Sequence, residues 1–223
     1  MSNMEMSPRK PKVKRQQTIA EEIANSITHG IGAGLSIAGL VLLIITAAVW
    51  GNAWYVVGFT LFGSSAVILY LSSTLYHAIT HKAVKRVLEI MDHSSIFIMI
   101  SGSYSAFVLT VLRDVGGWWI FGVLWGLTVV GIFLKTVFVS RFKLLSTLIY
   151  IGMGWTIIAV FPALMQRVSL STVVFLVAGG LSYTVGTIFY GIGEKMMWMH
   201  SVWHLFVIGG TVCHFFAAMF LLL

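Results

Sequence analysis

The stretch that closes the chain, MHSVWHLFVIGGTVCHFFAAMFLLL (residues 199–223), contains no Asp, Glu, Lys or Arg. About 20 apolar residues cross the hydrocarbon core of a bilayer as an α-helix, so this stretch predicts a membrane-spanning helix. Two of its histidines, His200 and His204, lie four positions apart at its beginning. An imidazole is costly in a nonpolar bilayer unless it is paired or hydrated, and the pair therefore indicates a polar site at one end of the helix.

The same apolar pattern recurs along the whole chain. Of its 223 residues, 58% are hydrophobic and 9% are charged, whereas soluble domains carry about 25% charged residues. We therefore predict an all-α membrane protein, with a seven-transmembrane helix bundle as its single domain over residues 21–223. Gly122 and Gly126, spaced as GxxxG, predict close helix packing. Short connections predict antiparallel neighbours, and the expected helices are about 27–50, 53–80, 87–112, 116–138, 144–164, 170–192 and 199–222.

Basic residues set the expected orientation. With a cytoplasmic N-terminus, 12 of the 14 Lys and Arg residues lie inside and only Arg113 and Arg167 lie outside, which is the distribution that membrane proteins favour. The C-terminus is then outside, and residues 1–20 form a disordered basic tail that lacks the apolar segment of a cleavable signal peptide. The net charge of +7 does not indicate nucleic-acid binding, because the charges lie at the ends of apolar runs.

Polar residues from three expected helices fall in one layer near the cytoplasmic side. His77 ends the second helix, Asp92 begins the third, and His200 and His204 begin the seventh. With a rise of 1.5 Å per residue, these side chains lie roughly 6–14 Å inside their helix ends. Because residues i and i+4 share one helical face, His200 and His204 can converge on one metal ion.

A third imidazole would complete a three-histidine site with one open position, which is the arrangement of catalytic zinc. We predict His77 as this third ligand. Ser73, one turn before His77, could hold a metal-bound water or Asp92, and Asp92 would orient that water and help to deprotonate it. One alternative is that the histidines only hydrogen-bond a neighbouring helix. Another is a rival pair of His77 and His81, although His81 adjoins Lys82 and is expected to be hydrated.

A further polar stripe, Glu22, Asn25 and His29, leads into the first helix at positions i, i+3 and i+7. It is either an amphipathic entry segment with solvated side chains or a cap over the cytoplasmic mouth of the bundle, next to the metal layer. Of two other histidines, His93 is expected to pack or to support a residue of the metal site, and His214 to be a buried packing or hydrogen-bonding residue.

Taken together, these motifs resemble the hemolysin III family, within the larger progestin and adipoQ receptor group that is also similar to alkaline ceramidases. The resemblance implies a seven-helix bundle with its N-terminus inside. It also implies one zinc ion near the cytoplasmic leaflet, held by His77, His200 and His204, with Asp92 and Ser73 beside the metal-bound water. The matching stretches are EEIANSITHGIG (21–32), SSTLYH (72–77), MDHSSIFIMISGSY (91–104) and HSVWHLFV (200–207).

Three functions stay open at this point. The first is a zinc-dependent hydrolase of lipid amide or ester bonds in the cell membrane, which contributes to lipid and fluidity homeostasis. The second is a non-enzymatic membrane-homeostasis or sensor protein with structural zinc, and the third is a pore-forming cytolysin, as the family name implies. In each case membrane lipids are the expected partners, and association of several copies as a homo-oligomer is compatible with the architecture.

Overall fold

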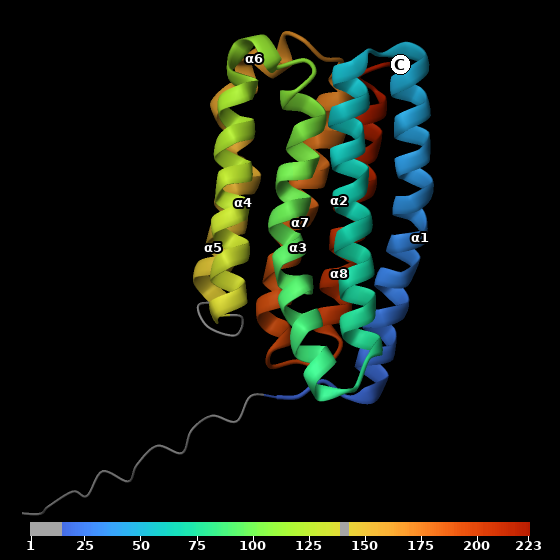
Figure 1. Cartoon of the computed structure of the whole chain (residues 1–223), viewed down its shortest axis with the longest axis vertical. Helices are drawn as coiled ribbons and strands as arrows, with labels where there is room; N and C mark the ends of the chain where they lie inside the picture. The colour runs from blue at the N-terminus through green and yellow to red at the C-terminus, as the bar shows by residue number, and fades with distance from the viewer. Residues whose placement is uncertain (1–14, 139–142) are drawn as a thin grey trace, which may run out of the picture.

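The computed structural model describes residues 15–138 and 143–223, and all regular secondary structure in these residues is helical. Long helices run side by side along the long axis of the molecule (Figure 1). The prediction of an all-α bundle is confirmed, while residues 1–14 of the predicted tail lie outside the described residues. In chain order the elements are α1 (Ile19–Trp50), α2 (Ala53–Ala78), α3 (Lys82–Val108), the π-helical turn η1 (Arg113–Gly117), α4 (Trp118–Phe138), α5 (Lys143–Gly154), the 3₁₀ helix η2 (Trp155–Val160), α6 (Phe161–Met165), α7 (Leu170–Gly193) and α8 (Met199–Met219).

Helix α1 begins at Ile19, well before the expected residue 27, because Thr18 caps it. The Thr18 side chain accepts a hydrogen bond from the Glu21 N–H, and the Glu21 carboxylate accepts one from the Thr18 N–H at 2.9 Å, which together form a capping box. The predicted polar stripe therefore lies within a continuous helix. Asn25 and His29 are 0% and 1% exposed, so the interpretation of a solvated entry segment is wrong for these two residues.

Helix α3 corresponds to the third predicted span but is less apolar than the others. It carries Asp92 and His93 together with several serines that are buried against neighbouring helices, namely Ser94, Ser95, Ser101, Ser103 and Ser105. Polar groups in a membrane helix are turned toward protein because lipid cannot hydrogen-bond them. Among the described residues, six stretches are long and apolar enough to cross a membrane: Ile19–Trp50, Ala53–Ala78, Arg113–Phe138, Lys143–Met165, Leu170–Gly193 and Met199–Met219.

The span Lys143–Met165 is broken, whereas a continuous helix over about 144–164 was expected. Its middle turns, Trp155–Val160, form the 3₁₀ helix η2. The Tyr104 hydroxyl of α3 donates a hydrogen bond to the Gly154 carbonyl at 2.6 Å and accepts one from the Ile157 N–H at 2.8 Å. Backbone groups that leave the α-helical pattern are thus satisfied by a side chain of another helix.

Two glycines that were expected at a helix interface face open space. A Cβ placed on Gly122 or Gly126 would have no heavy atom within 4 Å, so the predicted packing role of this pair is wrong within the chain. The close contact between α3 and α4 is made at Gly131, where a Cβ would lie 2.5 Å from the Phe97 ring. Any larger residue at that position would push the two helices apart.

Candidate metal centre

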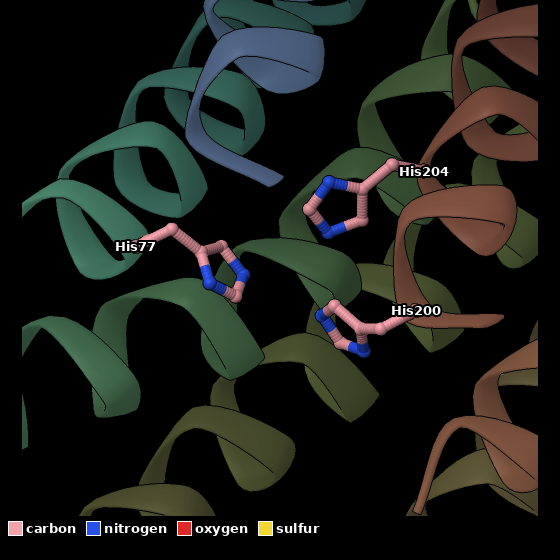
Figure 2. A group of neighbouring side chains, drawn as sticks. All are labelled: His77, His200 and His204. Carbon is pink, nitrogen blue, oxygen red and sulfur yellow. The ribbon is translucent and has the colours of Figure 1, made fainter. Parts of the chain in front are cut away.

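Three imidazoles from two helices converge near one end of the bundle (Figure 2). His77 lies in the last turn of α2, and His200 and His204 lie in the first two turns of α8. Each ring offers one nitrogen, and these nitrogens all lie within 4.8 Å of one another. The structure therefore brings together the three residues that were predicted as metal ligands.

Hydrogen bonds fix the tautomer of two of these rings. His77 Nδ1 lies 2.7 Å from Glu22 Oε2 and donates to it, because an ionised carboxylate can only accept. His204 Nδ1 lies 3.1 Å from Thr28 Oγ1. The Thr28 hydroxyl donates its own proton to the Ala24 carbonyl at 2.9 Å, so it accepts from His204. In their neutral form both rings therefore carry the lone pair on Nε2.

The Nε2 atoms of His77, His200 and His204 are all buried without a hydrogen-bond partner. A buried polar atom without a partner costs about 1–3 kcal/mol, so three at one place call for a common partner. Three neutral imidazoles suit zinc, whose catalytic sites use three protein ligands and keep one position open. Of the residues that the structure describes, only these three form such a group.

Two further predicted residues, Ser73 and Asp92, are not part of this cluster. Ser73 is one turn before His77 on α2, and its hydroxyl is buried without a hydrogen-bond partner. Asp92 on α3 is 7% exposed and lines a cavity. It is not one of the converging ligand residues, and its predicted role beside the metal stays a prediction.

The cavity has a volume of about 490 Å³ and lies among α3, α5, η2, α6, α7 and α8. Its lining surface is mostly apolar, although polar residues contribute to it, among them Asp92, His29 and, farther along α8, His214. The His29 ring stacks on the His204 ring with centroids 3.5 Å apart. Trp203, whose ring centroid lies 5.2 Å from that of His204, also lines the cavity. His29 and Trp203 therefore line the cavity and also contact the histidine cluster, through the His204 ring.

The polar stripe of α1 reaches the helices that carry the histidines. Glu22 contacts His77 through one carboxylate oxygen, and its other oxygen accepts a hydrogen bond from Lys85 Nζ at 2.8 Å. Asn25 Oδ1 accepts one from Ser201 Oγ at 2.6 Å. The stripe thus contacts the helices that carry the three histidines, and its contacts run sideways to α2, α3 and α8.

Sequence reasoning missed two residues of α1. The contact of Thr28 with His204 depends on how α1 packs on α8, which no local pattern specifies. Glu21 is 1% exposed, and its Oε1 accepts a hydrogen bond from the Trp198 N–H at 2.9 Å. Both residues share a face of α1 with Asn25, and this i, i+4, i+7 spacing is the signal that could have found them.

The remaining histidines have local roles. His93 Nδ1 lies 2.8 Å from the Glu89 carbonyl oxygen in its own helix, and His214 Nε2 lies 3.3 Å from the Leu176 carbonyl oxygen. The contact of His214 agrees with its predicted hydrogen-bonding role, whereas that of His93 is made within its own helix. His81 is exposed at the start of α3 and is not one of the converging ligands, so the rival pair with His77 has no structural support.

Comparison with known proteins identifies the family. Residues 17–215 match the family described as haemolysin-III related. The chain is 50% identical over 203 residues to a hemolysin-3 homolog of Bacillus subtilis (strain 168), an alignment that covers 91% of this chain and 95% of that protein. It is 46% identical over 207 residues to hemolysin-3 of Bacillus cereus, with 93% and 94% covered. The human monocyte to macrophage differentiation factor is 25% identical over 211 residues, with 90% and 84% covered.

The chain therefore belongs to the hemolysin III family, as its motifs predicted. Its apolar helices and its bacterial relatives make it a multi-pass protein of the cell membrane.

Proposed function

We propose that this chain is a zinc-dependent hydrolase that cleaves amide or ester bonds of membrane lipids and so contributes to lipid and fluidity homeostasis. One observation carries the proposal: a cluster of three imidazoles with buried, unpaired Nε2 atoms contacts His29 and Trp203, which line an apolar cavity together with Asp92. Metal-dependent lipid hydrolysis uses a Lewis acid, a proton acceptor and room for an acyl chain; the histidines would hold the first, and Asp92 and the cavity would supply the other two.

The proposal includes seven spans, with α3 as the third and the N-terminus in the cytoplasm. Helix α3 has 27 residues, which at 1.5 Å per residue is about 40 Å and exceeds the roughly 30 Å of a hydrocarbon core. It packs between α2 and α4, both of which belong to stretches apolar enough to cross a membrane. With this topology 12 of the 14 basic residues lie inside, and the histidine cluster is near the cytoplasmic leaflet.

In the proposed reaction the chain binds the ion through Nε2 of His77, His200 and His204. Zinc, when bound, supplies a Lewis acid that polarises a carbonyl and lowers the pKa of a water ligand toward about 7. Asp92 accepts the proton of the attacking water and passes it to the leaving amine or alcohol oxygen. Ser73 donates a hydrogen bond to the water or to the carbonyl oxygen. Water and the lipid are thereby converted to a carboxylic acid and an amine or alcohol.

The cavity favours a substrate with a long acyl chain. Its mostly apolar walls would hold the chain, while the carbonyl group would lie at Asp92, next to the histidine cluster. One wall belongs to the span Lys143–Met165, in whose apolar window only 6% of the residues are buried. A span so weakly packed against protein offers a lipid a lateral route into the cavity.

The proposal is tested on purified protein in lipid nanodiscs, with ceramides and acyl glycerolipids as candidate substrates. We expect release of fatty acid that stops on chelation and returns with zinc. The variant Asp92→Asn should be about 10²–10⁴-fold slower, whereas Asp114→Asn, which changes an exposed carboxylate in the η1 turn, should match wild type. Zinc-loaded wild-type protein that consumes none of these lipids would contradict the hydrolase, and unchanged turnover in Asp92→Asn would contradict its role as a base.

A structural role for zinc is the second candidate, and one observation favours it. The three residues come from α2 and α8, whose backbones approach each other at few positions. An ion would then crosslink two helices and stabilise the bundle. In that case His200→Ala lowers the thermal midpoint of the metal-loaded protein, and no lipid is consumed by the wild type.

A further inference from the structure

Helix α1 contributes no histidine to the cluster, yet it connects the two helices that do. It packs along α2 and also along α8, and Figure 1 shows it at the edge of the bundle beside α2. Its first three turns, residues 19–29, carry polar side chains on two faces. One face meets α8 and the other meets α2.

The face toward α8 carries three hydrogen-bonded pairs in register. The three α1 residues lie four and then three positions apart, and their three partners at the start of α8 lie three positions apart each time. A slip of either helix by one residue would break all three pairs, so together they define how the helices align. The pairs are Glu21 Oε1 with the Trp198 N–H (2.9 Å), Asn25 Oδ1 with Ser201 Oγ (2.6 Å) and Thr28 Oγ1 with His204 Nδ1 (3.1 Å).

The first pair holds an unusual turn. Trp198 has φ +68°, a left-handed conformation that a residue with a Cβ rarely adopts. It immediately precedes α8 and is two residues before His200. By accepting a hydrogen bond from the Trp198 N–H, the buried Glu21 carboxylate stabilises this turn and thereby the point at which α8 begins.

The face toward α2 bonds to the turn that carries the third ligand. Ser26 Oγ donates a hydrogen bond to the Thr74 carbonyl at 3.2 Å, and Glu22 accepts one from His77 Nδ1 at 2.7 Å. Glu22 and Thr28 therefore have the same role for histidines on different helices. Each holds Nδ1 of its histidine and leaves Nε2 free.

We infer that the first three turns of α1 are the positioning element of the metal site. Glu22 and Thr28 set the tautomer and ring orientation of His77 and His204, and the pair of Asn25 and Ser201 holds the register of α8. Partners of this kind fix a ligand imidazole and raise its basicity, and their loss costs about 10–100-fold in metal affinity. The inference rests on the metal site of the proposed function and assigns positioning roles to residues that bind no metal themselves.

The decisive variant is Thr28→Val, which removes the hydroxyl and keeps the shape of the side chain. Zinc affinity is measured on the full chain in detergent by competition with a chromophoric chelator, and ligand geometry by the visible spectrum of the cobalt(II) form. We expect Thr28→Val to bind zinc about 10–100-fold more weakly and to give an altered cobalt spectrum. Thr28→Ser keeps the hydroxyl and should restore both readouts.

A matched pair of serine variants separates positioning from general packing. Ser201→Ala removes the bond to Asn25, whereas Ser182→Ala removes a bond of the same kind between α7 and α8, from Ser182 Oγ to the Phe206 carbonyl at 2.7 Å. We expect only Ser201→Ala to weaken zinc binding, while both lower the thermal midpoint of the metal-free protein by similar amounts.

The outcomes distinguish this inference from the proposal on which it rests. Wild-type protein that binds no zinc would overturn the metal site and the inference with it. Wild-type binding together with unchanged affinity and cobalt spectrum in Thr28→Val and Ser201→Ala would overturn the inference alone. A loss of affinity that is equal in Ser182→Ala would also overturn it, because the effect would then come from bundle stability.

Discussion

The first three turns of α1 and the span Lys143–Met165 flank the same site and are built in opposite ways. The α1 turns are joined to their neighbours by buried polar side chains, with Asn25 and His29 almost fully enclosed. The span has 6% of its apolar window buried, is interrupted by a 3₁₀ segment and forms a wall of the cavity. The α1 turns hold imidazoles by hydrogen bonds, whereas the span Lys143–Met165 lines the cavity with little protein packed against it.

This difference shows how one helix bundle can combine a rigid centre with an accessible cavity. Side-chain hydrogen bonds between helices specify direction and register, whereas apolar contacts with lipid specify neither. Buried polar contacts join α1 to the helices that carry the histidines, whereas the span that borders the cavity is little buried against protein. The two regions should therefore respond differently to substitution: α1 through metal affinity, and the span through local stability.

The largest effect is expected from His204→Ala. This change removes a ligand, the contact with Thr28 and the ring that stacks on His29. We expect elemental analysis of the purified variant to find no bound zinc. His214→Ala, which changes a histidine farther along the same helix, should keep its zinc. If His204→Ala binds as much zinc as the wild type, the comparison fails, because the first turns of α1 would then position no metal ligand through His204.

The next effect is expected from Glu22→Ala. Without the carboxylate, His77 loses the acceptor that keeps its proton on Nδ1, and zinc affinity should fall about 10–100-fold. The competition titration with a chelator measures this. Glu194→Ala, which removes an exposed carboxylate bonded to Lys143, is the matched control and should bind zinc as the wild type does. If Glu22→Ala and Glu194→Ala lose the same zinc affinity, the effect comes from the loss of a negative charge and not from the orientation of the His77 ring.

A smaller effect of another kind is expected from Tyr104→Phe. The change leaves the Gly154 carbonyl and the Ile157 N–H without the hydroxyl that bonds both, and we expect a loss of about 1–3 kcal/mol in stability. Hydrogen exchange should become faster over residues 154–160 while zinc affinity stays the same. If zinc affinity falls as well, the two regions are coupled and the comparison fails.

The smallest effect is expected from Gly152→Ala in the loosely packed span. A Cβ there would meet no atom within 4 Å, so the gain in helix propensity should raise stability by about 0.5–1 kcal/mol. The same substitution at Gly32 of α1 would bring a Cβ within 2.7 Å of the Tyr70 ring and should destabilise the protein. Thermal midpoints of both variants, measured without metal, test whether the sign reverses between the two regions.

The sequence predicts the helices and the histidine cluster well, for physical reasons that are local. Apolar runs of membrane-spanning length mark helices whatever their neighbours are, and the depth of a residue in the membrane follows from its distance to the helix end. His77, His200 and His204 could be combined because depth is the coordinate they share. The resemblance carried by the four motifs pointed to the same residues, and the family was confirmed.

The features that the sequence did not predict depend on which neighbouring helix, or lipid, a side chain faces. The role of Thr28 follows from the packing of α1 on α8, and the outward orientation of Gly122 and Gly126 follows from the rotation of α4 about its axis. Neither is specified by spacing within one helix. The early start of α1, in contrast, could have been predicted, because the capping box of Thr18 and Glu21 is a local sequence signal that precedes the apolar run.

The capped start of α1 also bears on how the protein should be produced. Just before and within the cap, the Arg15 guanidinium bonds to Glu21, and Gln17 Oε1 accepts a hydrogen bond from Asn25 Nδ2 at 3.0 Å. A purification tag joined upstream of residue 15 leaves these contacts in place. A truncation that begins at Ile19 would remove the cap and both contacts, and the preparation would be expected to load metal poorly although every ligand is present.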